Sequence, residues 1–260
     1  MAVVGAGRRE VTAGSRSLQA SGPAALRVLE WLTRIGPAPV ETIAVAFSWT
    51  DRRALQCVAQ LVEDGWVRRQ PMTRGEGSLL LVTPAGLDRV RAAVRSRSRP
   101  PSPTWWAHHV ACAWTAAWLT VRGRALQGPA EVDVDESWRG ELSWRDARGP
   151  HQVGHRPDLA WLPDGGGRVA VEVELARKTT PRLEAVLDVH AAWRIGGRTA
   201  GVIYVCGGQS VRERIVKLAA ERGLSQERGG GLRAELLENV QRQAREARQA
   251  ARARFDGRTG

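Results

Sequence analysis

Apolar residues recur every three or four positions near the start of the chain, as they do in amphipathic helices. The first such stretch ends at Gly36-Pro37, and Ser48-Trp49-Thr50-Asp51 supplies a cap signal before the third. Shorter apolar runs follow, and Pro84 is placed to begin another helix. The pattern predicts, in chain order, helices over 24–35, 40–46 and 52–63, strands over 66–69 and 79–83, and a helix over 85–94.

The third predicted helix separates an apolar face from a polar one. The face expected to be buried comprises Leu55, Val58, Leu61 and Val62, and the face expected to be exposed comprises Arg52, Arg53, Gln56 and Gln60. Three helices followed by a strand, a loop and a strand is the order of a winged helix-turn-helix, whose recognition helix enters the major groove. This order predicts DNA contacts by Arg52, Arg53 and Gln56, and a phosphate or minor-groove contact by Arg74 in the loop. The alternative is an exposed polar face that contacts protein.

A stretch of proline, serine and arginine separates this region from the rest of the chain. Residues 95–103 read RSRSRPPSP and have no apolar period, which is typical of a spacer. We therefore predict a flexible N-terminus at 1–22, a winged helix-turn-helix domain at 23–95, a linker at 96–103, a second domain at 104–224 and a basic helical tail at 225–260.

The second domain alternates between helical and strand-like patterns. The predicted elements are a helix over 105–121, a mixed segment with one strand over 131–144, strands over 156–162 and 168–175, a helix over 181–193, a buried strand over 199–206 and a helix over 210–222. From Leu232 the tail reads as one basic helix, either solvated or lying along nucleic acid. The expected fold class is α/β (α+β overall): an N-terminal winged helix-turn-helix, a restriction-endonuclease-like α/β core and a basic C-terminal helix.

The acidic residues of the two neighbouring strands carry the candidate chemistry. In Val171-Glu172-Val173-Glu174, alternation places both carboxylates on one face, and the turn at 163–167 brings Asp158 alongside. Neighbouring carboxylates are costly to bury unless a cation lies between them. A Mg²⁺ or Mn²⁺ ion held by Asp158 and Glu172 would activate water and stabilise charge on a phosphate, with Glu174 and Lys178 completing the catalytic set. The alternative is a set of ion pairs with Arg156 and Arg177.

Several other residues are weaker candidates. His155 is a second group that could orient water or phosphate, and Glu136 or Glu141 could supply a further acid. His108 and His109 are expected to pack or cap rather than to bind metal. The cysteines are far apart and odd in number, which favours small core residues over a disulfide or thiolate site.

Two resemblances follow from these motifs. Pro157-Asp158, Glu172-x-Glu174 and the order of elements from Trp105 to Arg222 resemble the PD-(D/E)xK nuclease superfamily, although Glu174 stands where lysine is usual and Lys178 would substitute from a shifted position. The winged helix, the pair His108-His109 and the strand Val171–Glu174 together resemble the replication-relaxation family of plasmids and integrative elements. That resemblance implies a role in the replication of such an element or in its control, with DNA as the partner.

The charge of the chain agrees with a nucleic-acid partner. The 260 residues carry a formal net charge of +12 and a pI of about 11.2, which favours binding to a polyanion; a GC-rich genome, which also enriches arginine, is the alternative explanation. No apolar run is long enough to span a bilayer and no signal-peptide core is present, so we expect a cytoplasmic protein. The expected function is double-stranded DNA binding, with a homodimer and replication or transfer proteins as further candidate partners. A metal-dependent endonuclease and a protein–protein adaptor are the alternatives.

Overall fold

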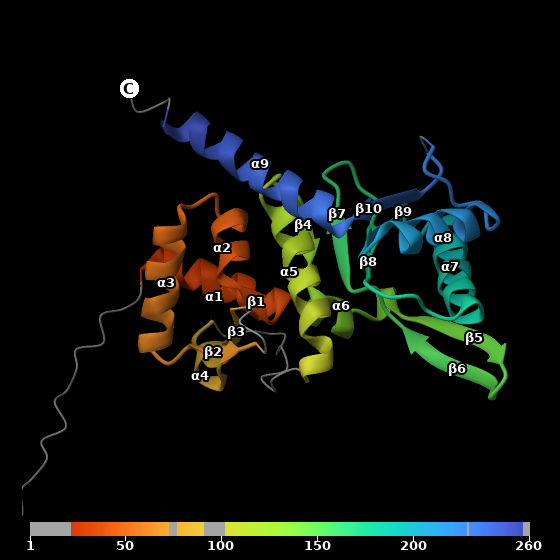
Figure 1. Ribbon diagram of the computed structural model, residues 1–260, viewed down its shortest axis with the longest axis horizontal. Coiled ribbons are helices and arrows are strands. Elements are labelled where there is room, and N and C mark those ends of the chain that lie inside the picture. Colours follow the sequence, from red (N-terminus) through yellow and green to blue (C-terminus); the bar gives the residue numbers. More distant parts are fainter. Residues whose placement is uncertain (1–21, 73–76, 91–101, 228, 257–260) are drawn as a thin grey trace, which may run out of the picture.

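The computed structural model describes residues 22–72, 77–90, 102–227 and 229–256, which form an α/β fold (Figure 1). The elements before residue 91 are α1 (Pro23–Ile35), β1 (Ala38–Pro39), α2 (Val40–Ala46), α3 (Asp51–Glu63), β2 (Val67–Pro71), β3 (Ser78–Val82) and α4 (Pro84–Arg89). Their strands form an antiparallel sheet in the order β1-β3-β2. The predicted helices and strands are all present here, and the short strand β1 between α1 and α2 was not predicted. The predicted N-terminus at 1–22 lies, apart from its last residue, outside the described residues, as does most of the predicted linker at 96–103.

Helix α3 begins where the sequence predicts, because the Thr50 side chain accepts a hydrogen bond from the backbone N–H of Arg53. Its buried residues are Ala54, Val58 and Leu61. The prediction that Leu55 is buried was wrong, since 46% of this residue is exposed. The inward stripe runs through Ala54 instead, and the neighbouring position points about 100° away on a helix.

The elements after residue 101 include a larger sheet and the helices around it. They are η2 (Pro103–Trp105), α5 (Trp106–Thr120), β4 (Ala125–Gln127), α6 (Pro129–Val134), η3 (Glu136–Trp138), β5 (Gly140–Asp146), β6 (Gly149–His155), β7 (Leu159–Leu162), β8 (Val169–Glu174), α7 (Thr180–Ile195), β9 (Gly201–Cys206), α8 (Gln209–Ala220), β10 (Leu232–Leu236) and α9 (Leu237–Asp256). The five-stranded sheet has the order β10-β9-β8-β7-β4, with β8, β9 and β10 parallel and the other pairs antiparallel. Strands β5 and β6 form a separate hairpin.

Strand β8 lies in the middle of this sheet, and every residue of it is buried. Val169, Val171 and Val173 join the hydrophobic cluster that contains α5, whereas Ala170 joins the cluster that contains α7 and α8. The valines and Ala170 thus lie on opposite faces of β8. This agrees with the prediction that Glu172 and Glu174 point to the face opposite the valines.

The C-terminal segment differs from its prediction. Residues 232–236 form β10, parallel to β9, and the helix begins only at Leu237. Helix α9 is also not a poorly buried tail, because Val240 and Ala244 are fully buried against α5 and α2. The sequence LRAEL consists largely of good helix formers, so pairing with β9 overrides local propensity here.

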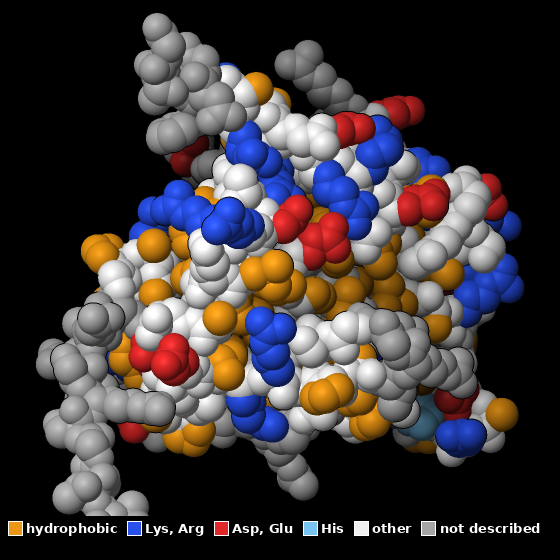
Figure 2. Space-filling model, turned by 60° about the vertical axis from the view of Figure 1, so that its left-hand side comes forward, with side chains coloured by type: hydrophobic (Ala, Val, Ile, Leu, Met, Phe, Trp, Pro, Cys, Tyr) orange, Lys and Arg blue, Asp and Glu red, His pale blue; other side chains and the backbone are white. Residues whose placement is uncertain are grey.

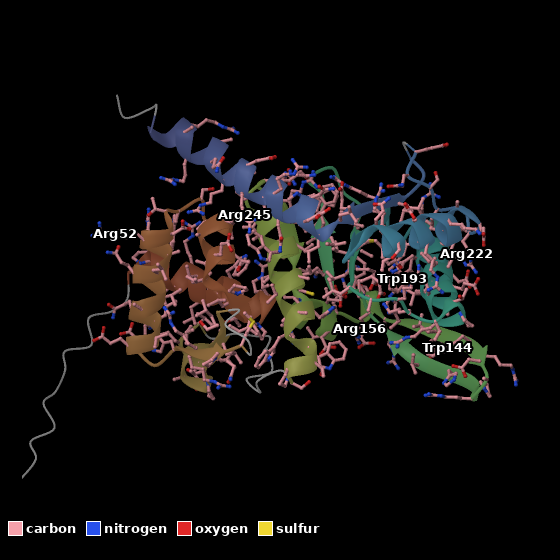
Figure 3. All side chains as sticks on the ribbon, viewed as in Figure 1. Arg52, Trp144, Arg156, Trp193, Arg222 and Arg245 are labelled. Atoms are coloured by element: carbon pink, nitrogen blue, oxygen red, sulfur yellow. The ribbon has the colours of Figure 1, made fainter. Side chains whose placement is uncertain are left out.

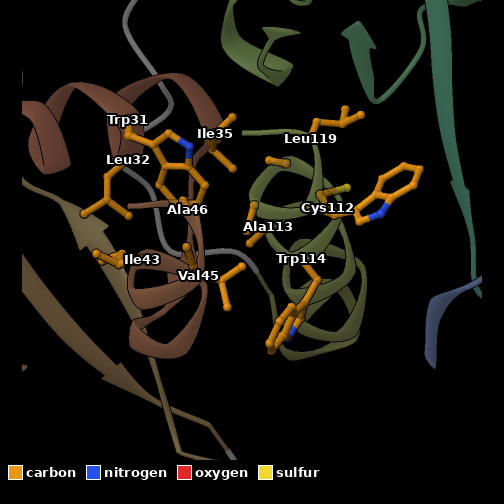
Figure 4. Packing of buried hydrophobic residues seen from close by; sticks show 14 of the residues in the cluster. Trp31, Leu32, Ile35, Ile43, Val45, Ala46, Cys112, Ala113, Trp114 and Leu119 are labelled. Atoms are coloured by element: carbon orange, nitrogen blue, oxygen red, sulfur yellow. The ribbon is translucent and has the colours of Figure 1, made fainter. Parts of the chain in front are cut away.

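One hydrophobic cluster spans both predicted domains. Helix α5 is apolar on almost all sides, since it lies between α1 and α2, the large sheet and α9. Ile35 of α1, Val45 and Ala46 of α2 and Ala113 of α5 all belong to this cluster, and Figure 4 shows the α2 residues on the side of their helix that faces α5. The predicted boundary at 96–103 therefore does not divide the core.

A close backbone contact joins α1 to the loop before α6. Arg34 of α1 forms an ion pair of 2.9 Å with Glu131, and a Cβ added to Gly128 would lie 2.1 Å from the carbonyl oxygen of Arg34. Only glycine permits such an approach without a shift of one backbone segment.

No helix in the described part of the chain is both long and apolar enough to cross a membrane.

Candidate functional site

The outer face of α3 is the first candidate site. Arg52, Arg53 and Gln56 are all exposed on it, as predicted. The Arg53 guanidinium lies 4.5 Å from the centre of the Trp49 ring, a cation–π contact that restrains this side chain. Figure 3 shows Arg52 on the side of α3 that points away from the rest of the molecule. The fourth predicted DNA contact, Arg74, lies outside the described residues.

The C-terminal helix is tied to the start of α3. Arg248 donates to the carbonyl oxygen of Trp49 at 2.7 Å and to Asp51 at 2.8 Å, and Arg245 pairs with Glu41 at 3.0 Å. On this side of the molecule, basic side chains lie mainly toward the top of the view, with acidic ones among them (Figure 2). The basic residues of α9 therefore serve partly to hold α2 and α3 in place.

Glu172 is the most enclosed of the predicted acidic residues, at 4% exposure. Its Oε1 lies 3.0 Å from Nε2 of His155, the last residue of β6, and 3.0 Å from Nε2 of His190 on α7. Burial alone would raise the pKa of Glu172, but the two imidazoles outweigh burial and hold this pKa well below its ordinary value. Burial also lowers the pKa of His190.

Asp158 occupies a different position, just before β7. Its Oδ2 accepts a hydrogen bond of 2.7 Å from the backbone N–H of Val173, and its Oδ1 lies 3.0 Å from Nε2 of His108 on α5. The Sγ of Cys112, one turn further along α5, lies 3.5 Å from the same nitrogen. Burial lowers the pKa of His108, but its hydrogen bond to Asp158 and the charge of Asp158 outweigh burial, so this pKa is raised. His108 thus contacts a predicted metal ligand, although its position in the sequence predicts only packing or capping.

Glu174 forms a third pair, with Lys178 four residues later. Burial raises the pKa of Glu174 despite the opposing charge of Lys178, and the charges of Glu172 and Asp158 raise it further. The predicted catalytic residues Asp158, Glu172, Glu174 and Lys178 therefore lie close enough to influence one another electrostatically. Each carboxylate has its own basic neighbour.

The other acidic candidates are engaged elsewhere. Glu136 pairs with Arg156 at 2.6 Å, and Glu141 accepts from Gln152 at 3.4 Å. Arg156 also donates to the carbonyl oxygens of Val132 and Asp135, so this arginine binds η3 and α6. The alternative in which Arg156 neutralises the buried carboxylates does not match these contacts.

The described residues include two groups whose candidate ligand atoms all lie within 4.8 Å of one another. One is His108, Cys112 and Asp158, and the other is His155, Glu172 and His190. The predicted metal ligands Asp158 and Glu172 thus fall into separate groups, each containing histidine. The four-residue spacing of His108 and Cys112 was a signal available in the sequence, whereas nothing local marked His190.

Comparison with known proteins adds little to this geometry. No protein-family model and no curated protein sequence matches the chain. Among solved structures, the chain is similar to one described as the crystal structure of protein VC1899 from Vibrio cholerae, with a TM-score of 0.34 and 10% sequence identity. The match covers 88% of this chain and 56% of that chain, so the chain spans little more than half the length of the protein it matches. Nothing about function follows from a similarity at this level.

Proposed function

We propose that this protein binds double-stranded DNA, with the N-terminal elements acting as a winged helix-turn-helix and α3 as its recognition helix. The observation that carries the proposal is the outer face of α3, where Arg52, Arg53 and Gln56 are exposed together at one end of the molecule. Arginine and glutamine are residues that contact base edges and phosphates from a recognition helix. The net charge of +12 favours the same partner.

The resemblance to replication-relaxation proteins supports a role in the replication of a plasmid or mobile element, or in its control, in the cytoplasm. A homodimer on a palindromic site and contacts with replication or transfer proteins belong to this proposal. A protein–protein adaptor that contacts no DNA is the alternative, and DNA-binding measurements distinguish the two.

Duplex binding is expected to weaken steeply as salt rises. Four phosphate contacts would reduce the association constant by about 100-fold between roughly 50 and 200 mM salt, because each neutralised phosphate releases condensed counterions. Fluorescence anisotropy with a labelled duplex measures this slope, and a single strand of equal length serves as the control. Absence of binding at the lowest salt, or binding to the single strand alone, would contradict the proposal.

A metal-dependent endonuclease is a second candidate, favoured by the mutual electrostatic influence of Asp158, Glu172 and Glu174. We expect Mg²⁺- or Mn²⁺-dependent nicking of supercoiled plasmid, lost in Asp158→Ala, because that substitution removes a metal ligand. Glu213→Ala, at an exposed position on α8, is the control that should retain activity. Nicking that survives Asp158→Ala and Glu172→Ala would exclude this site.

A further inference from the structure

His155, Glu172 and His190 converge from three elements on one enclosed point. The side chains are 11%, 5% and 1% exposed, respectively. Both imidazole Nε2 atoms lie 3.0 Å from the same carboxylate oxygen, Oε1. Tyr204 is fully buried on β9 at the position paired with Glu172, and its ring lies 6.1 Å from that of His190.

Hydrogen bonding alone leaves this cluster unsatisfied. His190 bonds to Glu172, but His155 Nε2 is buried without a hydrogen-bond partner although it lies as close to the carboxylate. The buried Tyr204 hydroxyl and His190 Nδ1 also have none among the described residues. A polar atom buried without a partner is destabilising, and His155 Nε2 is such an atom directly beside the buried carboxylate, which indicates a missing ligand at this point.

We propose that His155, Glu172 and His190 bind a transition-metal ion of the zinc class. Two imidazole nitrogens and one carboxylate oxygen form a ligand set that zinc uses in proteins. Bonds of about 2.0–2.1 Å in a tetrahedron place neighbouring ligand atoms roughly 3.3 Å apart, close to the 3.0 Å separations here. The ion would engage the His155 nitrogen and balance the buried carboxylate.

The ligand class separates this site from a magnesium or manganese site. Imidazole suits zinc, copper, iron and nickel, whereas Mg²⁺ takes oxygen ligands. The other group is a weaker candidate, because Asp158 Oδ2 already accepts a hydrogen bond from the backbone N–H of Val173, and none of its three residues is among the described residues with a buried side-chain atom that lacks a partner.

The surroundings indicate a structural ion. The Trp193 ring stacks on His155, with centroids 6.2 Å apart, and forms a T-shaped pair with His190, with centroids 5.3 Å apart. These rings limit access by substrate, as is typical of a closed metal site. An ion here would join the end of β6, the central strand β8 and helix α7. The inference is independent of DNA binding by α3.

The test is metal content and Co²⁺ substitution in the full chain. We expect one zinc per chain by elemental analysis after purification, and Co²⁺ in its place to give tetrahedral visible bands without a thiolate charge-transfer band. His155→Ala and His190→Ala should each lose the metal. His151→Ala is the matched control, since this histidine pairs with Asp146 outside both groups, and it should retain the metal.

Three results would overturn the proposal. The first is that the wild-type chain, stripped with chelator, binds neither Zn²⁺ nor Co²⁺. The second is a Co²⁺ spectrum with a thiolate band that disappears in Cys112→Ala, which would place the ion at the other group. The third is displacement of Co²⁺ by equimolar Mg²⁺, which would indicate oxygen ligands. All three can be measured even where His190→Ala does not fold, because they use the wild-type chain or a different variant.

Discussion

Replacing Arg52 and Arg53 together by alanine is expected to weaken duplex DNA binding by roughly 100-fold at low salt, since each well-placed arginine contact contributes about 1–3 kcal/mol. The two residues are adjacent on α3 and their side chains diverge, so they would reach different groups on the DNA. The helix cap should survive the substitution, because Thr50 accepts from the backbone N–H of Arg53 rather than from its side chain. Anisotropy titrations of both proteins against one duplex measure the change.

A matched variant distinguishes a specific surface from net charge. Arg145→Ala with Arg148→Ala removes the same charge from the β5–β6 hairpin, at the opposite end of the molecule from α3 (Figure 1). We expect less than about a threefold loss for this control, because charges beyond a Debye length of about 10 Å are largely screened. Equal losses for both variants would show that binding depends on overall charge. An unchanged affinity in the α3 variant would remove this helix from the interface.

Features set by local periodicity could be predicted from the sequence. The exposure of Arg52, Arg53 and Gln56 follows from the helical period, and the shared direction of Glu172 and Glu174 follows from the twofold period of a strand. The helical period did not predict that Leu55 is exposed. An apolar stripe along α3 can include either Ala54 or Leu55, and the buried residue is Ala54.

Features set by distant contacts could not be predicted. His190 reaches Glu172 only because α7 packs across the sheet, and His108 reaches Asp158 across 50 positions of sequence. Arg248 contacts Asp51 across 197 positions, and Val240 and Ala244 of the same helix are buried in the shared cluster, so the predicted basic tail is part of the fold. Apolar and charge patterns show which face of an element is buried but not which other element covers it. The histidine partners of the carboxylates therefore became visible only in the fold.

Trp118 provides the test of whether that fold unfolds as one unit. The residue is fully buried on α5, and its indole N–H donates to Gln243 of α9 at 3.2 Å. It also belongs to the hydrophobic cluster shared by the N-terminal helices and the large sheet. Trp118→Ala is expected to reduce the free energy of unfolding by about 3–5 kcal/mol, through lost burial and the cavity that remains.

Trp105→Ala is the matched control, because it is the same substitution at a residue that directly precedes the same helix and is 58% exposed. Its effect is expected to stay within about 0.5 kcal/mol, as for most surface substitutions. Urea denaturation followed by circular dichroism measures both values. Because one cluster connects the two predicted domains, the wild type should show a single transition that Trp118→Ala moves as a whole. Two transitions, of which Trp118→Ala moves only one, would instead mean that the two halves unfold separately. In that case α5 would stabilise only the half whose transition moves.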